Sequence, residues 1–128
     1  DDKTAGCLDD GMLSIIVPTF NEEKTGWLEK ILSSFKPFRS RCEILFVDGG
    51  SADRTLEMIS RHGFKTLLSN SSNRGARLRI GFKHSTGDLV LLHHPRSYVE
   101  QSGLEHLLQI SRTLKKKDAY SHSFERST

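Results

Sequence analysis

The chain has 128 residues, of which 35% are hydrophobic and 27% are charged, and its formal net charge is +3. This length allows one domain with a single hydrophobic core but excludes two, and this composition is ordinary for a globular protein, so we do not expect an intrinsically disordered chain. No apolar run approaches the ~20 residues that a helix needs to cross a bilayer, so the sequence predicts no transmembrane segment.

Short apolar runs alternate with segments of helical periodicity along most of the chain. Residues 1–12 are polar and rich in glycine and aspartate, and we expect an unstructured leader there. After this leader, in chain order, the pattern predicts a strand at 13–17, a helix at 27–35, a strand at 43–47, a helix at about 53–63, a strand at 64–68, a helix at 73–84, a strand at 89–92, a helix from 102 and a strand from 119.

Boundary residues support several of these elements. We expect Pro18 to end the first strand and Pro37 to stop the first helix, because proline lacks the N–H group that donates a hydrogen bond in a sheet or in a helix. Gly63 is the residue type that favours the left-handed conformation after a helix, and we expect Gly87 to close the third helix. Residues 102–105, which read Ser-Gly-Leu-Glu, have the capping-box pattern and predict the start of the last helix.

This alternating order predicts an α/β fold, namely a doubly wound, mostly parallel sheet with helices on both faces, in one domain over residues 13–128. Residues 89–92 are apolar throughout, so we expect their strand to be central. In such sheets ligands bind outside the carboxyl ends of the strands. The expected site therefore lies in the strand-end loops, at residues 18–23, 48–53, 69–74 and 93–97.

The charge distribution and the cysteine content indicate which binding partners and which cellular compartment to expect. The dense basic run at 115–117 is typical of the solvated end of a helix, so we predict no nucleic-acid partner. Cys7 and Cys42 are too few for a disulfide framework or a zinc site, and Cys42 opens an apolar stretch typical of a core. Because the N-terminus also lacks a secretory signal pattern, we predict a soluble protein of the cytoplasm.

The strand-end loops carry a set of motifs that is specific in its order and spacing. Residues 14–23, which read SIIVPTFNEE, closely resemble the opening strand and loop of family 2 glycosyltransferases. Residues 43–55 resemble that family's second strand and its aspartate loop, and residues 73–88 resemble its next two segments. The resemblance covers about residues 13–97. It implies a GT-A (Rossmann-like) fold, incomplete in this chain, and sugar transfer from a nucleotide-sugar donor, such as a UDP-sugar, to a glycosyl acceptor.

The resemblance also assigns roles to residues of the first loops. The family places a uracil-contacting aspartate at Asp48, and its nucleoside contacts lie along Asn21 and Glu22. Gly49, with the glycine after it, allows positive φ and a close approach of the backbone to the ligand. Arg74 could pair with a phosphate or close over the base, which suits a guanidinium fork.

Each of these residues also has a simpler structural interpretation. Residues 48–50 could form a turn only, and residues 21–23 could be a helix N-terminus with favourable charges. For Asp53 we favour a capping role at the start of the next helix, and for Asp88 a structural hydrogen bond. Arg74 could be a surface residue. An unrelated Rossmann-like cofactor domain is disfavoured, because no Gly-x-Gly-x-x-Gly pattern follows the first strand.

The loop after the fourth strand departs from the family pattern. Family 2 enzymes usually carry an Asp-x-Asp type motif there, whose last carboxylate binds Mn²⁺ or Mg²⁺, and the most similar branch typically reads His-Ala-Asp-Thr. Here residues 94–97 read His-Pro-Arg-Ser, so Arg96 occupies the position of the metal-binding aspartate. A guanidinium has no lone pair to offer a cation. The sequence therefore predicts no metal site of the usual kind.

Two functional outcomes stay open at this point. Arg96, with His94 beside it, could replace the metal and stabilise the departing diphosphate directly. Alternatively, the chain could be a non-catalytic nucleotide-binding or scaffold domain. A zinc site at His93 and His94 is a weaker interpretation, because adjacent strand residues face opposite ways. The residues expected to bind the nucleotide sugar are Pro18, Asn21, Glu22, Asp48, Gly49, Arg74, His94 and Arg96.

The catalytic base cannot be assigned to any residue of this sequence. In the family, the carboxylate that deprotonates the acceptor comes from a segment well after the metal motif. The later acidic residues here are Glu105, which the capping box explains, and Asp118. We therefore expect the chain to be a fragment of a longer transferase.

Overall fold

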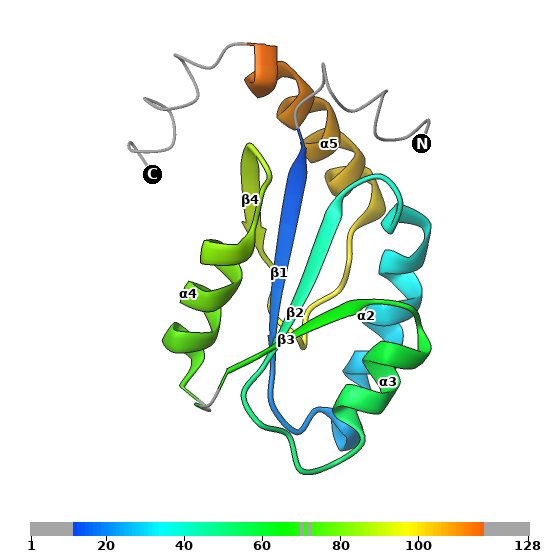
Figure 1. Cartoon of the computed structure of the whole chain (residues 1–128). Coiled ribbons are helices and arrows are strands. Elements are labelled where there is room, and N and C mark those ends of the chain that lie inside the picture. The colour runs from blue at the N-terminus through cyan, green and yellow to red at the C-terminus, as the bar shows by residue number, and fades with distance from the viewer. Residues whose placement is uncertain (1–11, 70, 72, 117–128) are drawn as a thin grey trace.

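The computed structural model describes residues 12–69, 71 and 73–116, with side chains described up to residue 113. The predicted leader up to residue 11 and the strand predicted from 119 lie outside the described residues. In chain order the elements are β1 (Leu13–Thr19), η1 (Glu23–Thr25), α2 (Trp27–Phe35), η2 (Lys36–Phe38), β2 (Glu43–Asp48), α3 (Thr55–Arg61), β3 (Lys65–Leu68), α4 (Arg74–His84), β4 (Leu89–Leu92) and α5 (Gln101–Lys116) (Figure 1).

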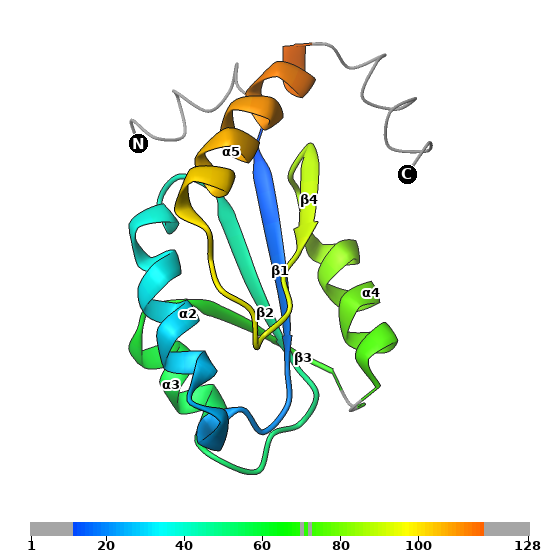
Figure 2. The same cartoon turned by 180° about the vertical axis from the view of Figure 1, so that it is seen from behind.

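The four strands form one parallel sheet in the order β3-β2-β1-β4. β1 pairs with β2 on one side, where Thr19 lies opposite Asp48, and with β4 on the other, where Ile16 lies opposite Leu92. Helices cover both faces, as Figures 1 and 2 show from opposite sides. The predicted doubly wound α/β fold is confirmed, and the carboxyl ends of β1 and β2 meet at one edge of the sheet.

Side-chain alternation along β1 divides the core between the two faces. Leu13, Ile15 and Val17 pack with α2, α3 and α5 in one buried cluster. Each fully buried aliphatic or aromatic side chain of this kind stabilises the fold by about 1.5–3 kcal/mol. Cys42 belongs to the same cluster, and burial raises the pKa of its thiol to about 11. The prediction that Cys42 is a core residue is therefore confirmed.

The second face is covered by α4, which approaches the sheet most closely at Gly81. A β-carbon at Gly81 would lie 2.5 Å from Cγ2 of Ile16 and 3.0 Å from Cγ2 of Val47. Real β-carbons do not approach other atoms so closely, so either the helix or the strands would have to move. Glycine at this position is therefore a packing requirement, since it costs helix propensity.

We expect Gly81→Ala to lower the free energy of unfolding by about 1–3 kcal/mol, because overpacking at the sheet outweighs the gain of about 1 kcal/mol in helix propensity. Gly103→Ala in α5 is the matched control. There the nearest atom to the new β-carbon is Oε1 of Glu100, the far end of a flexible side chain. Urea unfolding of both variants checks the prediction, and equal stabilities would contradict the close packing of α4.

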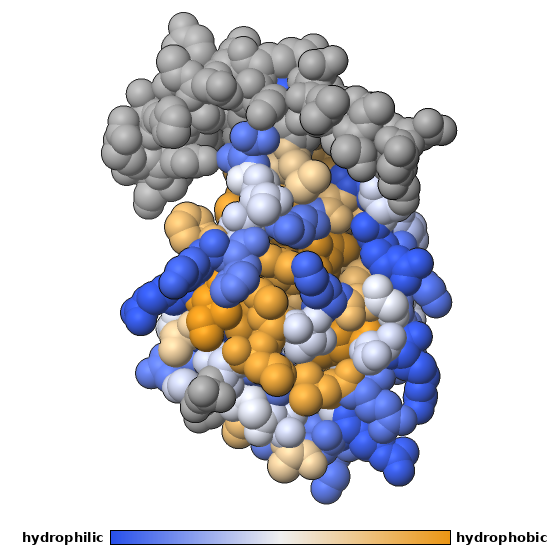
Figure 3. Space-filling model, viewed as in Figure 1, coloured by the Kyte–Doolittle hydropathy of each residue, from blue (hydrophilic) through white to orange (hydrophobic). Residues whose placement is uncertain are grey.

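Hydrophobic residues gather around the middle of the face that Figure 1 presents, and Figure 3 shows hydrophilic residues around them. Among the described residues, the large hydrophobic side chains with the greatest exposure are Leu68, Phe82, Leu92 and Tyr98. No helix of the described part of the chain is both long and apolar enough to span a membrane.

Several local predictions need correction. Pro18 does not end β1, which continues to Thr19, because β2 still pairs with β1 at Pro18 while the pairing with β4 reaches only Ile16. In the described part of the chain β4 lies at an edge of the sheet, not at its centre, and α5 covers its apolar side chains from one face. Gly87 does not close α4, which ends at His84. The N–H of Gly87 donates to Oγ of Ser14, and a β-carbon at Gly87 would lie 2.5 Å from that oxygen. Glycine is therefore needed here because the chain passes so close to β1.

The predicted capping box at the last helix is also wrong. α5 begins at Gln101, which places Ser102 inside the first turn instead of before it. Glu105 then faces another partner: its two carboxylate oxygens accept from the guanidinium of Arg41 at 2.6 and 2.7 Å. This bidentate pair joins α5 to the turn before β2, and it lowers the pKa of Glu105.

Candidate functional site

The loops that follow β1 and β2 are fastened to each other by hydrogen bonds. Asn21 has a φ of 51°, its N–H donates to Oγ of Ser51 at 2.8 Å, and its side-chain oxygen accepts from the N–H of Ala52 at 2.8 Å. The N–H of Glu22 donates to Oγ1 of Thr55 at 2.8 Å. Asparagine tolerates the left-handed region better than most residues. The two loops therefore form one unit at the edge of the sheet.

Asp53 belongs to the same network and lies two residues before the start of α3. Its carboxylate accepts from the N–H of Thr55 at 2.9 Å and from the N–H of Glu23 at 3.1 Å. Burial would raise the pKa of Asp53, but the hydrogen bonds from Thr55 and Glu23 outweigh it and hold the pKa below its ordinary value. The predicted N-cap role of Asp53 is therefore wrong, because Arg54 occupies the N-cap of α3 and makes no side-chain capping hydrogen bond. Asp53 instead ties the segment before α3 to the loop after β1.

Asp48 is completely buried, and both of its oxygens are engaged. One accepts from the hydroxyls of Thr19 and Ser51 at 2.8 and 2.6 Å, and the other accepts from the N–H groups of Gly50 and Ser51 at 3.0 and 2.7 Å. Of the two glycines after Asp48, Gly50 has the positive φ, at 98°, whereas Gly49 donates its N–H to the carbonyl of Thr19. The Asp48 carboxylate therefore shapes this turn.

A pocket of about 270 Å³ opens beside these loops at the carboxyl edge of the sheet. Its walls come from the end of β1, the first turn and a half of α4, and the loop after β4. Its lining residues are Pro18, Phe20, Glu22, Arg74, Arg77, His94, Pro95 and Arg96. Three arginines face one glutamate, which leaves an excess of two positive charges.

The charged side chains of the pocket differ in burial. Arg77 is largely buried, and burial lowers its pKa while the carboxylates of Asp48 and Glu22 act against this shift. Nε of Arg96 lies 3.3 Å from Oε1 of Glu22 in an ion pair. The N–H of Arg96 donates to Nδ1 of His94 at 3.0 Å, which leaves Nε2 of that ring as the donor. The pocket is therefore rich in donors suited to an anion.

The structure brings Pro18, Glu22, Arg74, His94 and Arg96, all predicted from the sequence, together in this pocket. The other predicted residues lie in the loops beside it: Asp48 and Gly49 are buried in the turn, and Asn21 lines a separate shallow depression with Lys24, Ala52 and Asp53.

The sequence patterns did not single out Phe20, Pro95 or Arg77. Arg77 carried a usable signal, because it follows Arg74 by three residues and so lies on the same face of α4.

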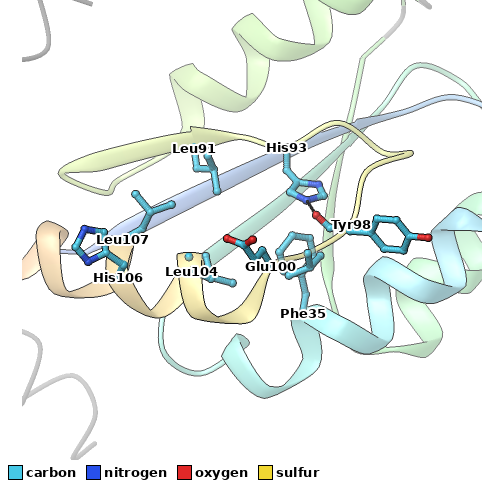
Figure 4. A pocket seen from close by; sticks show the side chains of 10 residues that line it. Phe35, Leu91, His93, Tyr98, Glu100, Leu104, His106 and Leu107 are labelled. Atoms are coloured by element: carbon cyan, nitrogen blue, oxygen red, sulfur yellow. Dashed lines mark hydrogen bonds between the residues drawn. The ribbon is translucent and has the colours of Figure 1, made fainter.

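A second cavity, of about 360 Å³, lies under the loop after β4, between that strand and α5 (Figure 4). His93 lines it, with Nε2 at 3.2 Å from the carbonyl of Tyr98 and its ring edge-on to Phe35. Burial lowers the pKa of His93, so the ring is neutral at pH 7. His93 and His94, which follow the end of β4, thus line different cavities. Across the described ranges, no three His, Cys, Asp or Glu side chains form a group that could hold a metal.

Residues 14–120 match the sequence profile of the family described as "Glycosyl transferase family 2". A relative from Methanococcus voltae, named a dolichyl N-acetyl-alpha-D-glucosaminyl phosphate glucuronosyltransferase, is 31% identical over 83% of this chain and 36% of its own length. A second, the undecaprenyl-phosphate 4-deoxy-4-formamido-L-arabinose transferase of Pectobacterium carotovorum, is 27% identical over 62% of this chain and 27% of its own length. The chain thus spans about a third of the length of these curated relatives.

Two solved structures show the same fold. A structure of TarS 1-349 from S. aureus superposes with a TM-score of 0.67 at 24% identity, covering 75% of this chain and 31% of that solved chain. Glucosyl-3-phosphoglycerate synthase from Mycobacterium tuberculosis, solved in complex with Mn²⁺, uridine diphosphate and glucosyl-3-phosphoglycerate, superposes with a TM-score of 0.58 at 20% identity, covering 73% of this chain and 35% of the synthase.

Proposed function

The chain belongs to glycosyltransferase family 2, and on that premise we propose that it forms the donor-binding part of an enzyme that transfers a sugar from a nucleotide-sugar donor. One observation carries the proposal. The pocket at the carboxyl edge of the sheet holds three arginines against one glutamate, and this excess of two positive charges matches the two negative charges on the diphosphate of a nucleotide sugar.

We assign the diphosphate to Arg74, Arg77 and Arg96, with His94 as a further donor. During sugar transfer, negative charge grows on the departing nucleoside diphosphate, and fixed cations at that position lower the barrier. The nucleoside would lie over Pro18 and Phe20, on the loops that Asn21, Asp48 and Gly49 build. The catalytic base stays unassigned, because none of these residues offers a carboxylate free of a structural partner.

The donor set of this pocket does not fit a divalent cation. Mn²⁺ and Mg²⁺ prefer several oxygen ligands, above all carboxylates. Among the described residues that line the pocket, Glu22 is the single carboxylate. It already pairs with Arg96, which stands where the family has its metal-binding aspartate. We therefore propose that donor binding in this chain is independent of metal and that Arg96 supplies the positive charge.

The acceptor proposal comes from the relatives. Both curated relatives carry names that refer to sugar transfer on dolichyl or undecaprenyl phosphate. We propose an acceptor of the same class, a polyprenyl-phosphate-linked molecule at a membrane surface, approached from the cytoplasm as the sequence predicts.

A thermal-shift titration with UDP, GDP, CDP and ADP, each in EDTA and in Mn²⁺, tests the donor proposal. A ligand present at 100 times its Kd stabilises the native state by about 2.7 kcal/mol. We expect one of the four diphosphates to raise the Tm, equally in both conditions. A shift that requires Mn²⁺ would contradict the role of Arg96, and no shift with any diphosphate would favour a scaffold domain over a donor site.

A further inference from the structure

We infer that Glu22 is a positioning residue, which holds Nε of Arg96 so that the two terminal nitrogens of that guanidinium are left for the diphosphate. The inference rests on the proposed function and adds a role for Glu22 that differs from the nucleoside contact predicted from the sequence. Glu22 is firmly held, Arg96 is exposed, and their contact engages one nitrogen of the guanidinium.

Glu22 is held on all sides. Its N–H donates to Oγ1 of Thr55, and its carbonyl accepts from the N–H and the hydroxyl of Thr25 at 3.2 and 2.9 Å. Its carboxylate accepts from the N–H of Phe20 at 3.3 Å, and the side chain is only 5% exposed. The backbone bonds fix the position of the residue, and if the buried carboxylate turned away, the N–H of Phe20 would lose its acceptor. Glu22 is therefore a fixed negative charge.

Arg96 is the exposed member of the pair. Its side chain is 53% exposed, and it comes from a loop in which Pro95 is buried and His94 accepts the N–H of Arg96. An unrestrained arginine loses about 2 kcal/mol of side-chain entropy when a ligand orders it. Pairing with Glu22 before the donor binds removes part of that cost, since the fixed carboxylate preorganises the guanidinium.

The contact uses only one of the five guanidinium donors. Nε of Arg96 donates to Oε1 of Glu22, and neither Nη1 nor Nη2 donates a hydrogen bond to any residue that the structure describes. These two nitrogens form the edge of the fork that binds phosphate oxygens in pairs. Each oxygen of Glu22 already has a donor, from Phe20 or from Arg96, and because the side chain is only 5% exposed little of the carboxylate is open to a ribose hydroxyl.

A double-mutant cycle separates positioning from direct contact. The variants are Glu22→Gln, Arg96→Ala and the double substitution, and the ligands are whichever of UDP, GDP, CDP and ADP binds the unmodified chain, together with its nucleoside. In EDTA we expect Glu22→Gln to lower the affinity for the diphosphate about three- to tenfold. The same substitution should have no effect in the Arg96→Ala background, and it should leave nucleoside affinity unchanged.

Glu105→Gln is the matched control, because it breaks an arginine–glutamate pair, Arg41–Glu105, that also links distant segments but lies away from the pocket. Its affinity for the diphosphate should equal that of the unmodified chain, and circular dichroism verifies that every variant is folded. An equal loss from Glu22→Gln with and without Arg96, or a loss of nucleoside affinity, would show a direct contact and overturn the inference.

The remaining outcomes separate the inference from the proposed function. If Glu22→Gln binds the diphosphate as well as the unmodified chain does, Arg96 needs no positioning and the inference fails alone. If Arg96→Ala also binds unchanged, the pair has no part in a donor site that still exists. If the unmodified chain binds none of the four diphosphates, the proposed function fails and takes the inference with it.

Discussion

Replacing Arg96 with aspartate is expected to abolish diphosphate binding in EDTA and to make binding depend on Mn²⁺. The substitution removes a cation from the pocket and adds an anion, so the excess of two positive charges disappears. Losing a charge-assisted contact alone costs about 1.5–3 kcal/mol, which is a tenfold to more than hundredfold loss of affinity. The introduced carboxylate supplies a hard oxygen ligand at the position where the family binds its metal.

Two companion variants make this test specific. Arg96→Ala removes the cation without offering a metal ligand, so it should lose affinity both in EDTA and in Mn²⁺. Arg96→Lys keeps the charge but lacks the planar fork, and we expect an intermediate affinity. Isothermal titration with the diphosphate measures all three. Binding by Arg96→Asp in EDTA at the affinity of the unmodified chain would remove Arg96 from the site, and failure of Mn²⁺ to restore any binding would contradict its alignment with the family's metal ligand.

Asp48→Ala is expected to lower the free energy of unfolding by about 3–5 kcal/mol, the largest stability effect we predict for the candidate site. The substitution removes the acceptor for two N–H groups and two hydroxyls, and it does so where the side chain has no access to water. A single domain has a stability of about 5–15 kcal/mol, so this is a large fraction of the total.

Asp48→Asn should cost much less, about 1 kcal/mol, because the amide can reproduce the hydrogen bonds. Its oxygen can accept from the N–H groups of Gly50 and Ser51, while its NH₂ donates to the two hydroxyls, which rotate to become acceptors. Urea unfolding measures both variants. A loss below 1 kcal/mol for Asp48→Ala would show that other contacts hold the turn.

The same pair of variants tests the role that the family resemblance implies for Asp48. If the carboxylate contacts the nucleoside, Asp48→Asn should weaken diphosphate binding even though it keeps most of the stability. If the carboxylate only shapes the turn, as its complete burial favours, Asp48→Asn should bind nearly as well as the unmodified chain. Affinity measured at a temperature where both proteins are folded separates the two roles.

Local sequence patterns determined the elements of this fold and the edge of the sheet that carries the site. Apolar runs of four to six residues and helical spacing are properties of neighbours along the chain, so β1, β2, β3, β4 and the helices between them could be predicted. In a parallel sheet every strand ends at the same edge, which already brought the loops after β1, β2 and β4 together. The family motifs then identified Glu22, Arg74 and Arg96.

Only the tertiary structure decided which of these residues meet and which groups they satisfy. Glu22 and Arg96 are 74 residues apart, and their ion pair exists because β1 and β4 are neighbours in the sheet. Arg77 lines the pocket because α4 lies against the sheet at Gly81. Both carboxylate oxygens of Asp48 accept hydrogen bonds because the end of β1 and the turn after β2 surround it. Such contacts depend on how distant elements pack, and no pattern of neighbouring residues encodes them.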